Sequence, residues 1–88
     1  MNVRFRASFA KDLREVKDKE VLKRVKGIIE QVEQARSLQE IAHLKKLKGG
    51  GHYYRIRAGE YRIGLELEGG GVTFVRCLNR KEIYRYFP

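Results

Sequence analysis

Three arginines within eight positions are the side chains of this 88-residue sequence best suited to chemistry. Arg55 and Arg57 lie in the segment Tyr53–Arg57, and Arg62 lies in Tyr61–Leu67; both segments are typical of strands. Because side chains alternate across a sheet, a hairpin of these segments places all three arginines on one face. Guanidinium groups bind phosphate well but accept protons poorly. The spacing predicts a phosphate-binding face, although the solvated face of a half-buried sheet has the same pattern.

The overall charge favours a polyanionic partner. Twenty lysines and arginines against eleven acids give a net charge of +9. Between His43 and Arg62 there are six basic side chains and one acid, so the excess is concentrated beside the predicted hairpin. Binding to phosphates releases counterions, which favours such a cluster. An acidic protein partner, or a basic protein with no nucleic-acid role, would fit the charge as well.

Aromatic and basic residues around the hairpin predict contact with single-stranded RNA. Tyr53 and Tyr84 offer ring faces on which an unpaired base can stack, a contact worth about 1–3 kcal/mol per base. Arg76 joins the arginines if Val75 and Cys77 point into the core, while the opposite alternation of that strand stays open. The residues that we expect to bind RNA are Lys45, Lys46, Lys48, Tyr53 and Arg76.

The first half of the chain predicts elements that hold this hairpin in place. Residues 2–6 alternate between apolar and polar types, as in a short strand. Ser8 can cap a helix that carries Phe9 and Val16, and Asp18 can cap a second helix whose apolar stripe runs through Val21–Val32. Almost no linker separates the two helices, so they should form an antiparallel hairpin.

The second half predicts mainly strands. Ser37–Glu40 has the form of a capping box and should open a helical turn through Leu44, before a break at Gly49-Gly50-Gly51. One or two helical turns should also form within Arg80–Phe87. Three strands joined by glycine-containing turns are expected at Tyr53–Arg57, Tyr61–Leu67 and Val72–Leu78. The predicted class is α+β: an N-terminal strand, a helical hairpin, a three-stranded antiparallel meander and a short C-terminal helix, with one sheet packed against helices.

Length and composition predict a single domain over residues 1–88, located in the cytoplasm. No apolar stretch approaches the 18 residues of a membrane span, and the first residues lack the apolar segment of a signal peptide. Cys77 is the one cysteine, so we expect a buried structural thiol rather than a disulfide or a multi-cysteine zinc site. We predict neither a metal site nor a cofactor.

Three segments carry a family resemblance. They are Leu47-Lys48-Gly49, the run Tyr54–Ile63 (YRIRAGEYRI) and the tail Asn79–Arg85 (NRKEIYR). With these segments the chain resembles the RelE/ParE superfamily of toxins from type II toxin–antitoxin systems, and RelE-like members in particular. The resemblance covers essentially the whole chain, and the order of the predicted elements also fits.

The resemblance implies a metal-independent endoribonuclease, an mRNA interferase that cleaves mRNA in the ribosomal A site and inhibits translation. It implies a hetero-oligomer with a small acidic antitoxin, contact with the ribosome and mRNA, and no membrane partner. By position it implies that Arg62 and Arg80 bind the phosphate with Arg57 close by, and that Tyr84 stacks on or orients the substrate. The full catalytic set that it implies is Arg55, Arg57, Arg62, Arg80 and Tyr84.

Two departures from the RelE pattern leave the proton acceptor unassigned. RelE has lysines at the positions of Arg55 and Arg57, and many relatives have a histidine where this chain has Asn79. His43 and His52 remain, and each is expected to be an ordinary surface histidine. Two alternatives therefore stay open: a ParE-like inhibitor of DNA gyrase, and an RNA-binding relative with weak or no catalysis.

Overall fold

A computed structural model describes residues 1–49 and 51–88 and confirms the α+β class. The five strands form one sheet in the order β1-β5-β4-β3-β2. Strand β1 runs parallel to β5, and the other neighbours are antiparallel. The elements are β1 (Asn2–Phe5), α1 (Ala7–Glu15), α2 (Lys19–Gln34), a 3₁₀ turn (Leu38–Glu40), β2 (Leu44–Lys46), β3 (Tyr53–Ala58), β4 (Tyr61–Glu68), β5 (Gly71–Asn79) and α3 (Ile83–Tyr86).

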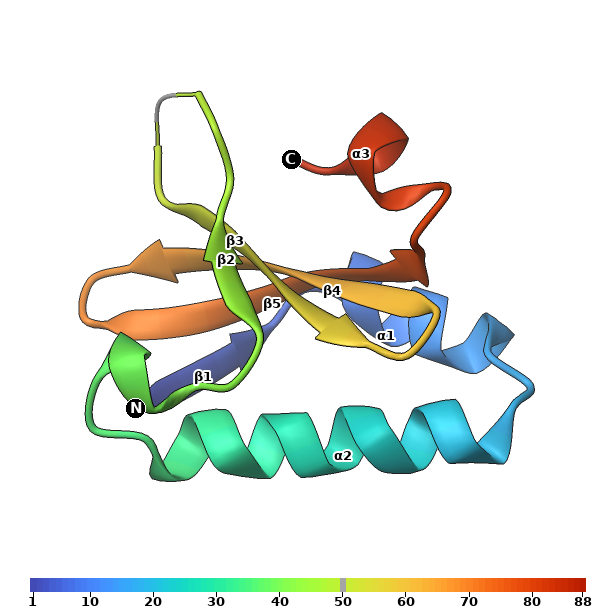
Figure 1. Cartoon of the computed structure of the whole chain (residues 1–88), viewed down its shortest axis with the longest axis horizontal. Coiled ribbons are helices and arrows are strands. Elements are labelled where there is room, and N and C mark those ends of the chain that lie inside the picture. Colours follow the sequence, from blue (N-terminus) through green and yellow to red (C-terminus); the bar gives the residue numbers. More distant parts are fainter. Residues whose placement is uncertain (50) are drawn as a thin grey trace.

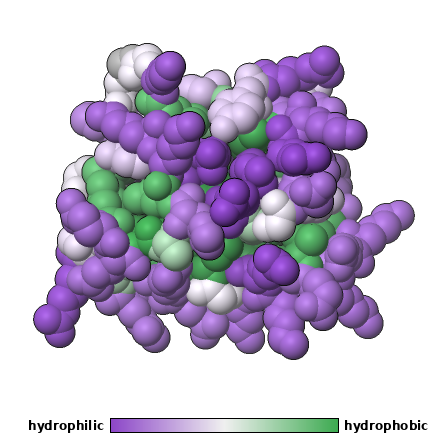
Figure 2. All heavy atoms as spheres, viewed as in Figure 1, coloured by the Kyte–Doolittle hydropathy of each residue, from purple (hydrophilic) through white to green (hydrophobic). Residues whose placement is uncertain are grey.

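The helices lie on different sides of the sheet. The chain turns back between α1 and α2, α2 crosses one side of the sheet, and α3 lies on the other (Figure 1). In the same view hydrophilic side chains cover most of the surface, and apolar atoms show mainly in a band between α2 and the sheet (Figure 2). The core between the sheet and the first two helices contains Phe9, Val25, Val32, Ile56, Ile63, Leu65, Phe74 and Cys77. Within the described part of the chain, no helix is long and apolar enough to span a membrane.

The second helix begins as predicted and the first does not. The Asp18 carboxylate accepts a hydrogen bond from the backbone N–H of Glu20 at 2.9 Å, which confirms it as the N-cap of α2. Ser8 lies inside α1, whose N-cap is Arg6, so the predicted Ser8 cap is wrong. The Ser8 hydroxyl instead donates to the carbonyl of Val75 in β5 at 2.6 Å. Because β1 leads directly into α1, the helix starts early enough for this hydroxyl to reach the sheet.

The segment after α2 also differs from the prediction. The helical turn ends at Glu40 rather than continuing to Leu44, because Leu44 pairs with Ile56 as the first residue of β2. The Glu40 carboxylate accepts a hydrogen bond from the backbone N–H of Arg36 at 3.2 Å, one residue earlier than a capping box requires. His43 turns the chain into β2 with a φ of 62°. Of the predicted glycine break, Gly50 lies outside the described residues.

Strand β5 combines both of the alternations that the sequence allowed. Phe74 pairs with Leu65 and Arg76 pairs with Gly64, so Val75 is an extra residue at a bulge. Before the bulge Phe74 points into the core, and after it Cys77 does, both with 1% exposure or less. Burial raises the pKa of the Cys77 thiol to about 12, as expected for a structural cysteine. The bulge therefore places Arg76 on the same face as Arg55.

Candidate nucleic-acid interface

The predicted arginines lie together on the face of the sheet opposite the core. Arg57 of β3 pairs directly with Arg62 of β4, and Arg55 pairs with Gly64 two residues further along. We call Arg55, Arg57 and Arg62 the arginine face. Their neighbours Ile56 and Ile63 are buried on the other side, so the predicted alternation is confirmed. Like charges directly opposite each other destabilise a sheet, and a bound anion would relieve that cost.

Arg62 is held by its own turn. Its Nη1 donates to the carbonyl oxygens of Gly59 at 2.8 Å and Tyr61 at 2.9 Å. Gly59 has a φ of 63°, a conformation that glycine adopts without steric cost, so the tight turn between β3 and β4 brings its carbonyl to this guanidinium. Partial burial, and then the charges of Arg55 and Arg57, lower the pKa of Arg62. Arg62 is thus fixed in place with donors left for an anion.

Tyr84 reaches the arginine face from α3. Its hydroxyl accepts a hydrogen bond from Nε of Arg55 at 2.9 Å, while its side chain remains largely exposed. Helix α3 can come this close because Phe87 packs over Gly64. A Cβ on Gly64 would lie 2.7 Å from the Phe87 ring, closer than van der Waals contact allows. Gly64 therefore provides the space by which the C-terminal turn places Tyr84 beside Arg55.

The predicted lysines line a cavity that adjoins the same tyrosine. This lysine groove has a volume of about 420 Å³ and is lined by Lys45, Lys46, Leu47, Lys48, Tyr84, Phe87 and Pro88. Lys45 pairs with Arg55 across β2 and β3, so it continues the row of positive charge onto the edge strand. Tyr84 contributes both to the lysine groove and to the arginine face, which makes the two parts one basic surface.

Three other predicted residues have partners within the protein. Nε of Arg80 lies 3.6 Å from a carboxylate oxygen of Glu60; both side chains are exposed, so a phosphate can compete with this weak pair. Tyr53 packs edge-on against Phe87, with ring centroids 5.6 Å apart. Arg76 forms two hydrogen bonds with the buried carboxylate of Asp12. Because Tyr53 and Arg76 are engaged within the protein, they are not among the RNA contacts that we propose.

His43 lies closer to the arginine face than the sequence suggested. Its Nδ1 is 3.5 Å from Nη2 of Arg57. It holds a left-handed backbone conformation that is uncommon outside glycine, and such conformations concentrate at functional sites. The two residues share a cavity of about 360 Å³ with Arg24, Gly27, Ile28, Gln31 and Ala58. Sequence reasoning missed this neighbour because β2, which brings it to Arg57, was not predicted.

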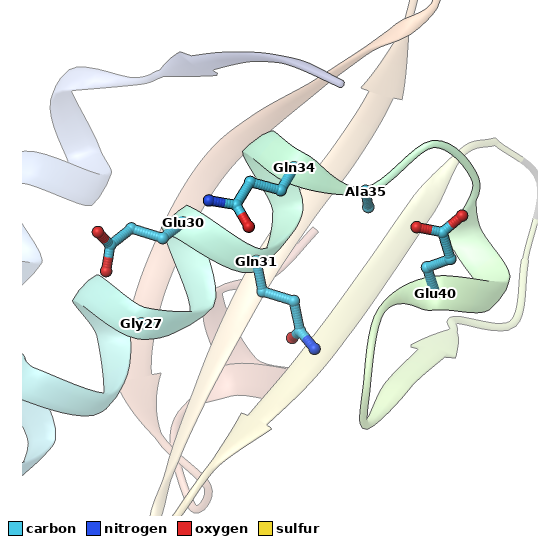
Figure 3. A pocket seen from close by; sticks show the side chains of 6 residues that line it. All are labelled: Gly27, Glu30, Gln31, Gln34, Ala35 and Glu40. Atoms are coloured by element: carbon cyan, nitrogen blue, oxygen red, sulfur yellow. The ribbon is translucent and has the colours of Figure 1, made fainter.

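A larger cavity on the α2 side has a different character. It has a volume of about 560 Å³ and lies between the C-terminal half of α2 and the 3₁₀ turn (Figure 3). Its lining includes the carboxylates of Glu30 and Glu40, with Gln31 and Gln34 between them. Carboxylates repel phosphate, so this cavity does not suit a nucleic acid. The basic surface remains the candidate interface.

A basic face on a five-stranded sheet, with a tyrosine brought to it by a C-terminal turn, defines a known class of small proteins. The chain matches the family described as the ParE toxin of type II toxin–antitoxin systems, parDE, over residues 3–84. Because this match spans nearly the whole sequence, the chain belongs to that family. The predicted membership of the RelE/ParE superfamily is confirmed.

The most informative relatives carry the name RelE. The chain is 47% identical over 89 residues to toxin RelE3 of Methanocaldococcus jannaschii, with 100% of both chains covered. It superimposes with a TM-score of 0.82 and 46% identity on a chain of the RelB–RelE antitoxin–toxin complex from Methanococcus jannaschii, covering 97% of this chain and 99% of that one. A chain of the archaeal RelE–RelB complex from Pyrococcus horikoshii has the same fold, with a TM-score of 0.71, 21% identity and coverage of 93% and 97%.

Proposed function

We propose that this protein is the toxin of a toxin–antitoxin pair and an endoribonuclease that cleaves ribosome-bound mRNA, and so acts in the cytoplasm. The observation that carries the proposal is the direct pairing of Arg57 with Arg62, beside the hydrogen bond between Arg55 and Tyr84. These side chains combine cations for a phosphate with an exposed ring for an unpaired base. Similarity to toxin RelE3 supports the toxin part of the proposal.

The proposed reaction is an in-line attack of a ribose 2′-oxygen on the adjacent phosphorus. Negative charge develops on the phosphate oxygens as the bond to the 5′-oxygen of the next nucleotide breaks, and that oxygen takes up a proton from water as it leaves. Arg62, fixed by its turn, and Arg57 opposite it stabilise that charge, and Arg80 can join them by exchanging Glu60 for the phosphate. Tyr84 orients the substrate by stacking, and its position is set by Arg55. The lysine groove receives the flanking backbone.

The proton of the attacking hydroxyl needs an acceptor that the arginines cannot provide. His43 is one acid–base side chain that lies against an arginine of this set, with its Nδ1 3.5 Å from Nη2 of Arg57. We assign it as the candidate general base, and substitution of such a group typically lowers a rate by about 10²-fold or more. His43→Gln should therefore slow cleavage strongly, whereas His52→Gln, on an exposed residue before β3, should not.

The proposal also includes an acidic antitoxin as partner in a hetero-oligomer. One solved relative is described as an antitoxin–toxin complex of RelB with RelE, and another as a RelE–RelB complex. Carboxylates of such a partner would complement the net charge of +9. A small acidic protein encoded beside this one should co-purify with it and suppress cleavage. Failure of that protein to bind would contradict this part of the proposal alone.

The deciding experiment is primer extension on mRNA from translating ribosomes. The wild-type protein should create new mRNA 5′ ends, and Arg62→Ala should reduce them by about 10²-fold or more, the loss expected for one fixed donor to a developing charge. Arg4→Ala, which removes an exposed arginine of β1, is the matched control and should retain cleavage. Circular dichroism should show the same folded state for both variants.

Two outcomes would contradict the nuclease proposal. If the wild-type protein yields no new 5′ ends, the chain is not a ribosome-dependent nuclease under those conditions. If the same preparation instead causes gyrase-dependent DNA cleavage, the match to the ParE family would describe the activity as well as the ancestry. RNA binding without either activity would identify a catalytically weak relative.

A further inference from the structure

Helix α3 is a single turn that other parts of the protein must hold in place. It spans Ile83–Tyr86, far shorter than a helix that is stable alone in water. Ile83 and Phe87 anchor one side of it in the interior. Two anchors define a line, and a further contact is needed to fix the rotation of the turn about that line. The position of Tyr84 therefore depends on a third contact.

Tyr86 supplies that contact. The guanidinium carbon of Arg76 lies 5.8 Å from the centroid of the Tyr86 ring, within the range of a cation–π interaction. Tyr86 and Tyr84 are two residues apart in the turn, so they project from different sides of it. A contact that fixes Tyr86 thus restricts the rocking of the turn that carries Tyr84. The arginine can do this only if it is itself immobile.

Asp12 makes it immobile. The Asp12 side chain is 6% exposed, and its two oxygens accept hydrogen bonds from Nε and Nη2 of Arg76 at 2.8 and 3.1 Å. One of the same oxygens also accepts the backbone N–H of Cys77 at 2.9 Å, so the carboxylate is tied to β5 as well. A bidentate pair fixes the plane of the guanidinium. The hydrogen bond that Arg76 donates to Asp12 raises the pKa of Arg76, as expected for a tightly held cation.

We propose that Asp12 of α1 is a positioning residue for the reaction, acting through Arg76 and the Tyr86 ring to keep the Tyr84 hydroxyl on Arg55. The catalytic role of Asp12 in this proposal rests on the proposed function, RNA cleavage. The effect of Asp12 on the hydrogen bond between Arg55 and Tyr84 does not depend on that function, because both side chains belong to this protein. The chain of contacts crosses from α1 through β5 to α3, and its last bond is the 2.9 Å contact from Arg55 to Tyr84.

The same pairing also controls the charge near the site. Arg76 and Arg55 both pair with Gly64, one from each neighbouring strand. Without Asp12, Arg76 would be a mobile cation beside the arginine face. Asp12 thus keeps this cation directed at α3 rather than at the substrate.

The first test reads the Arg55–Tyr84 bond directly by NMR. Because substitution of Asp12 also destabilises the sheet, the principal variant is Tyr86→Leu, with Tyr86→Phe as the matched control that keeps the ring. In wild type and Tyr86→Phe the Arg55 Nε–H resonance should be protected from exchange with water. In Tyr86→Leu that protection should fall by about two- to fivefold, the factor that corresponds to one partly exposed cation–π contact. Equal protection in all three proteins would overturn the proposal.

The second test is a double-mutant cycle on mRNA cleavage. Tyr86→Leu should lower the cleavage rate by a similar factor in the wild-type background and have no further effect in Tyr84→Phe, where the hydroxyl is already absent. Independent losses that multiply in the double variant would show that Tyr86 has a merely structural role and would overturn the proposal. If no protein cleaves mRNA, the proposed function fails, and the NMR result still decides the inference.

Discussion

Arg55 and Arg76 occupy equivalent places on the two sides of Gly64, but within the described part of the chain only one of these two arginines is paired with an acid. Both lie on the face of the sheet opposite the core, and both pair with the same glycine. Arg76 meets a buried carboxylate, Asp12, which takes up its charge inside the protein. Arg55 instead donates a hydrogen bond to the phenol of Tyr84, and its neighbours on the arginine face are other arginines.

The difference shows that residue type and strand position do not determine whether an arginine serves the fold or the function. The role of each arginine depends instead on the side chain that a distant element places next to its guanidinium group. Helix α1 reaches β5 and provides an acid, whereas α3 reaches β4 and provides a ring. The ion pair of Asp12 and Arg76 stabilises the protein. Among the described residues the arginine face has no such internal acid, so its charge is available for the external anion that we propose. Three substitutions test this contrast.

The largest expected effect comes from breaking the ion pair of Asp12 and Arg76. Asp12→Ala should lower the free energy of unfolding by about 3 kcal/mol, because it leaves Arg76 and the backbone N–H of Cys77 without their acceptor. Urea unfolding followed by circular dichroism measures this loss. Glu15→Ala, which removes an exposed acid of the same helix, should cost less than about 0.5 kcal/mol. Equal effects of the two would mean that the pair is not structural.

A smaller effect is expected at the glycine between the two arginines. Gly64→Ala places a methyl group against the Phe87 ring and should cost about 1–3 kcal/mol, the range of an overpacked core. It should also weaken RNA cleavage, since the displaced turn carries Tyr84. Gly27→Ala is the matched control: its Cβ meets nothing within 4 Å in the middle of α2, so it should raise stability by up to about 1 kcal/mol.

The smallest effect has the opposite sign. Arg57→Gln removes one of two opposed cations and should raise stability by about 0.3 kcal/mol, or roughly 1–2 °C in Tm, in low salt. High salt screens the repulsion and should abolish the gain. Thermal unfolding at low and high sodium chloride measures both. A loss of stability in low salt would show that Arg57 stabilises the fold, as Arg76 does, and does not act as an uncompensated cation of the arginine face.

Local sequence was sufficient to predict the strands other than β2, and the arginine face. Strict alternation around Ile56 and Ile63 determined which side of the hairpin is buried, and this placed Arg57 opposite Arg62. The stripe of α2 and its Asp18 cap are equally local signals. Such features depend on side chains a few positions apart, so a single sequence is enough to predict them.

Features that depend on distant contacts were not predictable in this way. Asp12 resembles a solvated helix residue, and the residue that pairs with it lies 64 positions away. The bulge at Val75 changes the alternation within one strand, and no local pattern marks it. His43 becomes a neighbour of Arg57 only because the short strand β2 pairs with β3. The general base and the positioning residue that we propose both belong to this group.

The way that α1 meets β5 has a consequence for the behaviour of the protein in solution. Strand β1 stops at Phe5, opposite Phe74, and the outer edge of β5 continues beyond it. There Ser8 donates to the carbonyl of Val75 and Asp12 accepts from the N–H of Cys77, so one turn of helix occupies the hydrogen-bonding groups that another strand would use. Exposed strand edges are templates for aggregation. Loss of Asp12 would therefore expose an unpaired edge of β5 to which another chain can bind. The carboxylate that we propose positions α3 thus also protects the molecule against self-association.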